Sequence, residues 1–165
     1  MTCCSCTRSP VTGRGSSSSS TRTTTLLRRR SLNTSASTSR VAAFTIDAGE
    51  PAVLLGTDTG PNPAEALLHA LAACLTTTLV YVAAARKVRL TEVESTLEGE
   101  MDVRGALGLS DEVRNGFTAI KVGFKVKGNA TAEKLQEVID RAQARSAVFD
   151  MVNHGVPVEV ALVTS

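Results

Sequence analysis

The chain has 165 residues, which suits one domain and is short for two. Its formal net charge of +2 conceals an asymmetry: residues 1–40 contain seven arginines and no acidic residue, whereas residues 41–165 contain the other 11 basic residues and all 16 acidic residues. The excess positive charge belongs to the tail and does not indicate a nucleic-acid partner. One tyrosine and four phenylalanines are also too few rings for a base-stacking surface.

Residues 1–40 form a tail rich in serine, threonine and arginine, with 11 serines and nine threonines. Such a segment buries too little apolar surface to offset its ordering entropy, so we expect it to be disordered. Its composition is typical of an organellar transit peptide, mitochondrial or plastid, and it lacks the apolar segment of a secretory signal. The alternatives are an unprocessed flexible arm or a misassigned start codon. Without a transit peptide, we expect the protein to be cytoplasmic. The domain itself is expected over residues 41–165.

The cysteines divide in the same way as the charges. Cys3, Cys4 and Cys6 lie in the tail, and Cys74 stands alone in the domain. This distribution excludes a disulfide scaffold. No further cysteine or nearby histidine completes a tetrahedral site with the tail cysteines, so we expect neither a metal nor a cofactor.

The first part of the domain predicts a β-hairpin. Val41–Ile46 and Ala52–Leu55 are short apolar segments joined by a turn that contains glycine and proline. A loop rich in glycine and proline follows over residues 56–63.

Residues 64–86 predict one long helix, with Asn62 as the N-cap and Pro63 in the first helical position. A helix that is apolar nearly all round is either buried or spans a membrane. Polar side chains interrupt this one: Glu65, His69 and Thr76–Thr78. We therefore expect a helix buried against a sheet, and no membrane partner.

Two long segments, Val88–Val103 and Phe117–Lys127, place mostly apolar residues on one face and most of their charged residues on the other, which predicts strands with one face on the core. If they pair, the acidic face of the first meets the lysine face of the second, as a solvated sheet surface. The loop between them is expected to contain a helical turn at residues 110–112.

The remainder predicts two helices and a strand. Thr131 is expected to cap a helix to Arg145, with an apolar stripe at the i, i+3, i+4, i+7 spacing. A short helix follows over Ser146–Asn153 and ends at His154 and Gly155, and Val156–Val163 is the last expected strand. The order of elements indicates an α+β domain.

Cys74 is the most interesting candidate for chemistry, because no serine–histidine–aspartate arrangement, phosphate-binding loop or dinucleotide fingerprint occurs. One interpretation is a small buried side chain, inert, with its pKa raised by burial. The other is a reactive thiol. Of its neighbours on the helix, Thr77 and Thr78 alone can form hydrogen bonds, so activating groups must come from elsewhere in the fold or from another subunit.

The segment from Gly60 to Cys74, GPNPAEALLHALAAC, resembles the signature of the OsmC/Ohr family, and the likeness continues through RSAVFD at residues 145–150 and VPVEV at residues 156–160. The resemblance covers about residues 41–165. It implies the OsmC-like fold, in which antiparallel sheets wrap a long buried central helix in an intertwined homodimer. It also implies reactive cysteines near the dimer interface.

In the peroxidase members of that family, one cysteine attacks a peroxide and a second forms a disulfide with it, which a dithiol then reduces. Cys74 matches the first cysteine, and Ser146 stands where the second is expected. The resemblance also implies an assisting glutamate and arginine, for which Glu65 and Arg40 are weak matches. Glu65 is a weak match because it lies nine residues before Cys74, about 180° around the helix, and therefore points away from Cys74.

Two functions stay open at this point. The first is a single-cysteine thiol peroxidase that reduces small hydrophobic peroxides with an external thiol as reductant. The second is a non-catalytic dimeric module that binds an apolar ligand or a partner.

Overall fold

The structure, a computed structural model, describes residues 47–163. The predictions on the tail, on the Val41–Ile46 strand and on Arg40 lie outside these residues. The described residues fall into two compact units that meet in sequence between Ala66 and Leu67, and each unit is treated by itself.

In the first unit, the segment after Pro51 is a short 3-10 helix, η1 (Ala52–Leu54), so the predicted strand Ala52–Leu55 is wrong. The Leu54 N–H donates to the Pro51 carbonyl over 2.8 Å, and Leu55 ends the turn with a left-handed φ of 63°. Local i to i+3 bonds therefore use the backbone groups that a strand would offer to a neighbour. At Gly56 a Cβ would lie 1.8 Å from the Glu50 carbonyl oxygen, so this close approach requires glycine.

Helix α1 (Pro63–Ala85) begins where the sequence predicts. The Glu65 N–H donates to Asn62 Oδ1 over 2.9 Å, and the Asn62 N–H donates to Glu65 Oε2 over 3.0 Å. This reciprocal pair is a capping box, and Pro63 in the first position has no N–H to leave unsatisfied.

One face of α1 is buried, and that face repeats every fourth residue: Leu71, Leu75, Leu79 and Ala83. The opposite side is exposed within the single chain and includes Val80 and Tyr81, the latter 70% exposed. By length and composition α1 could also cross a membrane, with a mean hydropathy of 1.8 over its most apolar window, a criterion that core helices of globular proteins also meet. The expected burial is therefore present on one side of the helix.

Strands β1 (Leu90–Met101) and β2 (Phe117–Gly128) form an antiparallel hairpin, which confirms both predicted strands within a residue or two at their ends. The register places Glu92 opposite Lys127, Glu94 opposite Lys125 and Glu98 opposite Lys121. Lys125 Nζ lies 3.2 Å from Glu94 Oε2. The predicted pairing of acidic and lysine faces is confirmed, although each exposed pair contributes only about 0.2–1 kcal/mol.

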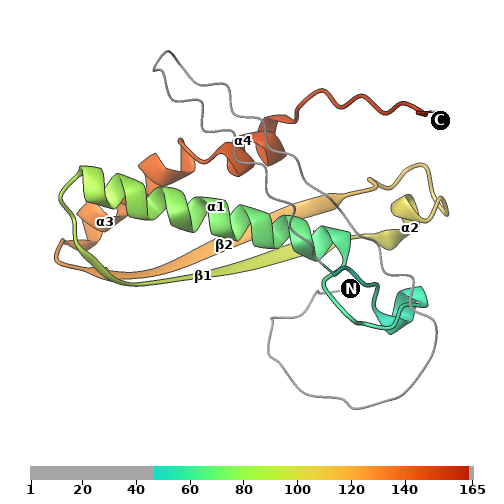
Figure 1. Cartoon of the computed structure of the whole chain (residues 1–165), viewed down its shortest axis with the longest axis horizontal. Helices are drawn as coiled ribbons and strands as arrows, with labels where there is room; N and C mark the ends of the chain where they lie inside the picture. The colour runs from blue at the N-terminus through green and yellow to red at the C-terminus, as the bar shows by residue number, and fades with distance from the viewer. Residues whose placement is uncertain (1–46, 164–165) are drawn as a thin grey trace. The chain divides into compact units, whose positions relative to one another are not determined.

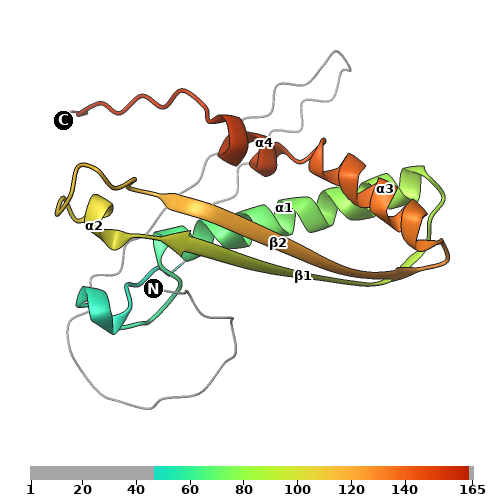
Figure 2. The ribbon, with the colours of Figure 1, turned by 180° about the vertical axis from the view of Figure 1, so that it is seen from behind.

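The core of the second unit lies between α1, α3 (Ala132–Gln143) and the apolar face of the hairpin, and α1 runs alongside that hairpin in both views of the chain (Figures 1 and 2). Its buried members are Leu79, Ala83, Val88, Val138 and Ala142. The Thr131 side chain caps α3, as predicted, by accepting from the Lys134 N–H. Arg86 pairs with Glu137, which ties the end of α1 to α3.

The connection between the strands differs from the prediction. Its helical turn is α2 (Val103–Ala106), and the expected turn at residues 110–112 is not helical. The Asp102 carboxylate accepts from the Arg104 N–H over 3.0 Å and so starts a helix where the alternating pattern predicts the last two residues of the strand. Gly105 permits this turn to pack closely, because a Cβ there would lie 2.5 Å from the Val113 carbonyl oxygen.

Helix α4 (Ala147–His154) confirms the predicted short helix, with Ser146 as its N-cap and Gly155, at a φ of 72°, just after its end. The predicted strand Val156–Val163 is wrong for the single chain, since no described strand pairs with it. Its side chains are exposed, Val160 by 92%. A strand needs a neighbour to share its backbone hydrogen bonds, and the described residues supply none.

Candidate functional site

Cys74 lies in the middle of α1, half-buried, next to the buried Leu75. It is the one cysteine among residues 47–163, and its thiol is free. Its carbonyl oxygen accepts from the Thr78 hydroxyl over 2.7 Å, a bond within the helix.

Ser146 is brought to Cys74 from 72 residues away in the chain. Its hydroxyl donates to Cys74 Sγ over 3.2 Å. Ser146 is 2% exposed, and within the described residues it is the single polar side chain in the buried class. The end of α3 positions it, because Ala142 is buried in the core and the Ser146 N–H donates to the Gln143 carbonyl over 3.3 Å.

The start of α4 approaches the same sulfur. The Ser146 Oγ accepts from the Phe149 N–H over 3.3 Å, so Ser146 caps α4 while its proton is directed at Cys74. The N–H groups of the first helical residues, Ala147 and Val148, act on the thiol as backbone donors. A helix N-terminus carries partial positive charge and is a favourable place for a thiolate.

These contacts lower the pKa of the Cys74 thiol. Burial raises the pKa, but the Ser146 hydroxyl and the N–H groups of Val148 and Ala147 outweigh it, with a further influence from the Thr78 hydroxyl. Because Thr78 has one hydroxyl proton and its 2.7 Å contact is with the Cys74 carbonyl, we assign Ser146 as the hydroxyl that serves the thiol. An inert, buried thiol would have a raised pKa, whereas the pKa of the Cys74 thiol is lowered.

The groups that lower this pKa are hydroxyls and peptide N–H groups, and none of them is a charged side chain. Glu65, the weak match for the assisting glutamate, forms the capping box with Asn62. Arg40, the weak match for the arginine, lies outside the described residues. His69 is exposed, and His154 pairs with Asp150 on α4.

The backbone donors at Ala147 and Val148 are the part of the site that sequence reasoning missed. The signal was present, because Ser146 was expected to begin a helix and a helix start offers unpaired N–H groups. Within residues 47–163, no three histidine, cysteine, aspartate or glutamate side chains are grouped so that they could hold a metal ion.

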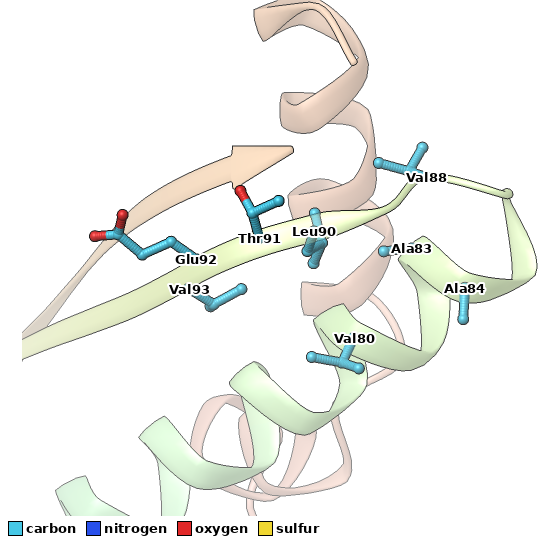
Figure 3. Close-up of a pocket in the computed structure, with 8 residues that line it drawn as sticks. All are labelled: Val80, Ala83, Ala84, Val88, Leu90, Thr91, Glu92 and Val93. Carbon is cyan, nitrogen blue, oxygen red and sulfur yellow. The ribbon is translucent and has the colours of Figure 1, made fainter. Parts of the chain in front are cut away.

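A second feature is an open apolar groove of about 320 Å³ between the end of α1 and the start of β1. Figure 3 shows Val80 and Ala84 of α1 on one side and Leu90 and Val93 of β1 on the other. Cys74 and Ser146 do not line this groove.

The described fold and site define an α+β domain with one free, half-buried thiol in the middle of α1, which contacts the start of α4. The family model described as OsmC-like protein matches residues 56–161, and the chain belongs to this family. The OsmC/Ohr resemblance of the sequence is thereby confirmed. A comparison with curated proteins found no match.

Solved structures share the fold. An OsmC-like protein from Mycoplasma pneumoniae is 21% identical, with a TM-score of 0.57 over 66% of this chain and 72% of that one. An organic hydroperoxide resistance protein OsmC from Legionella pneumophila, also described as a predicted redox protein, is 18% identical, with a TM-score of 0.51 over 68% of this chain and 76% of that one. An OsmC-like protein of unknown function from Vibrio cholerae is 16% identical, with a TM-score of 0.51 over 67% and 73% of the two chains.

Proposed function

We propose that this protein is a thiol-dependent peroxidase that reduces small organic hydroperoxides with Cys74 as its nucleophile. The observation that carries the proposal is the hydrogen bond from the buried Ser146 hydroxyl to Cys74 Sγ, at the start of α4. The lowered pKa of the thiol increases the thiolate fraction at neutral pH, and the thiolate is the nucleophilic form. The family assignment supports the same chemistry, since the similar Legionella protein is named for organic hydroperoxide resistance.

The proposed reaction needs no cofactor. The Cys74 thiolate attacks one peroxide oxygen, the S–O bond forms as the O–O bond breaks, and the departing alkoxide takes a proton to become the alcohol. The product on the protein is a sulfenic acid. Ser146 is an oxygen where a resolving thiol would be needed, so it cannot form a disulfide with Cys74.

An external thiol must therefore complete the cycle. A first thiol molecule attacks the sulfenic sulfur, which releases water and leaves a mixed disulfide on Cys74. A second thiolate attacks the outer sulfur of that disulfide, which returns the Cys74 thiol and releases the oxidised reductant. A dithiol supplies both equivalents from one molecule.

We also propose that the active form is a homodimer. The exposed side of α1 and the apolar Val156–Val163 segment support this, because both expose side chains that the single chain leaves uncovered. A second copy that covers them would give the wrapped helix and sheets that the family resemblance implies. Sedimentation of the protein should give twice the mass of one chain, and a monomer at micromolar concentration would contradict this part of the proposal.

Peroxide consumption tests the function directly. A parent protein with Cys3, Cys4 and Cys6 replaced by serine is mixed with cumene hydroperoxide and dithiothreitol, and loss of peroxide is followed. We expect turnover by the parent and none above background by Cys74→Ser. Equal consumption by the two proteins would exclude Cys74 as the nucleophile.

The apolar groove favours a second candidate, a non-catalytic module that binds a small apolar ligand. Ala84→Trp should fill the groove and weaken binding of an apolar fluorescent dye. Ala85→Trp is the matched control, because Ala85 is also exposed on α1 but does not line the groove. Equal dye binding by both variants would exclude the groove as the binding site.

A further inference from the structure

Two of the first backbone donors of α4 have hydrogen-bond acceptors, and the two between them lower the pKa of the Cys74 thiol. The Ser146 N–H donates to the Gln143 carbonyl, and the Phe149 N–H donates to Ser146 Oγ. The two N–H groups in between, on Ala147 and Val148, act on the Cys74 sulfur. In an isolated helix these four donors have no intrahelical partner.

Ser146 connects the start of α4 to the thiol on α1. Its oxygen accepts from within α4, and its proton is donated to a sulfur on α1. Its own backbone, with φ −77° and ψ 117°, is extended, as an N-cap requires, and the side chain is 2% exposed. A buried hydroxyl with both of its bonds made has one preferred orientation, so the start of α4 and the thiol are held in a fixed relation.

We propose that Ser146 is a positioning residue that docks the start of α4 on the Cys74 thiolate and thereby sets the reactivity of that thiol. The proposal rests on the proposed function, because it names the group that regulates the same sulfur. Without the Ser146 hydroxyl, the thiol loses one donor directly. The start of α4 is also released, and it carries the other two donors, the N–H groups of Ala147 and Val148.

The groups that lower the pKa of the Cys74 thiol are neutral. On α1 the polar group is the Thr78 hydroxyl, which donates to the Cys74 carbonyl, and on α4 the groups are the Ser146 hydroxyl and the Ala147 and Val148 N–H groups. No lysine, arginine, histidine or carboxylate is among these groups. The pH dependence of the thiol therefore reports on the α4 contact.

The experiment measures the rate of iodoacetamide labelling of Cys74 against pH, in the full chain with Cys3, Cys4 and Cys6 replaced by serine. The variants Ser146→Ala and Ser146→Gly both lack the hydroxyl, but glycine is a much better N-cap than alanine. A hydrogen bond to a charged group is strong enough that we expect labelling at neutral pH to slow about tenfold in both, with a higher midpoint. Ser146→Thr keeps the hydroxyl and should restore the parent profile.

Thr131→Ala is the matched control. It removes the cap of α3, where Thr131 accepts from Lys134 N–H, without touching Cys74. We expect lower stability towards urea and an unchanged labelling midpoint. An unchanged midpoint in Ser146→Gly, or an equal shift in Thr131→Ala, would overturn the proposal.

Labelling does not depend on peroxide turnover, so the two proposals fail separately. If Cys74 of the parent protein is labelled with a lowered pH midpoint but the protein consumes no peroxide, the proposed function is refuted and the role of Ser146 still holds. A parent that consumes peroxide while Ser146→Gly labels as the parent does refutes the positioning role alone.

Discussion

Replacing Ser146 by cysteine should convert the single thiol into a disulfide pair. The Ser146 Oγ lies 3.2 Å from Cys74 Sγ, so a sulfur at the same position needs only a small movement to reach the S–S bond length of about 2 Å. We expect oxidation with one equivalent of peroxide to remove both thiols of Ser146→Cys and to form an internal disulfide.

The magnitude follows from the length of chain that the bond would close. Residues 74 and 146 are 72 apart, and a loop of that length corresponds to about 4 kcal/mol of stabilisation in the chain-entropy description of disulfides. Loss of the serine cap costs about 1 kcal/mol. The oxidised variant should therefore exceed the parent in free energy of unfolding by up to about 3 kcal/mol, and its reduced form should fall about 1 kcal/mol below the parent.

The assay combines thiol counting with urea denaturation of the oxidised and reduced forms at one protein concentration. Ala147→Cys is the control, because its side chain is one residue further along and exposed. If Ser146→Cys retains both thiols after oxidation, or if oxidation adds no stability, the close contact between α1 and α4 is refuted.

Three further predictions concern the same elements. The labelling midpoint of Cys74 should be the same in low and high salt, because neutral donors lower its pKa; a midpoint that rises with salt would reveal a charged partner. Because the folded pKa lies below the unfolded one, the thiolate adds stability above the unfolded pKa and loses it as the pH falls through the folded pKa. The parent should therefore gain stability over Cys74→Ser as the pH rises towards the free-thiol pKa of about 8.5, and parallel urea midpoints would contradict this sign. Leu79 is 0% exposed, so Leu79→Ala should lower the free energy of unfolding in urea by about 3–5 kcal/mol. Leu109 is 71% exposed, so Leu109→Ala should lower it by under about 1 kcal/mol. Equal losses in the two variants would contradict the position of Leu79 in the core.

Much of this fold was predictable because its signals are local. Asn62 and Pro63 indicate the start of α1, Thr131 and Ser146 indicate the starts of α3 and α4, and each cap acts on N–H groups within a few residues. Which faces of the hairpin meet was also predictable, since acids along one strand and lysines along the other favour the pairing that brings the two charged faces together.

Other features depend on groups that the local pattern does not contain. Apolar residues favour a strand both at Ala52–Leu55 and at Val156–Val163, but a strand exists only where a neighbour shares its hydrogen bonds. The first segment satisfies its backbone in a 3-10 turn, and the second has no partner among the described residues.

The sequence by itself determined the family, the starts of α1, α3 and α4, and the identity of the candidate thiol. The tertiary structure decided the state of that thiol, because the burial that raises its pKa and the donors that lower it come from elements far apart in the chain. Ser146 is 72 residues from Cys74, and only the packing of α3 against α1 brings the start of α4 to the sulfur. A pKa depends on the surroundings of an atom in space, and a linear sequence does not contain those surroundings.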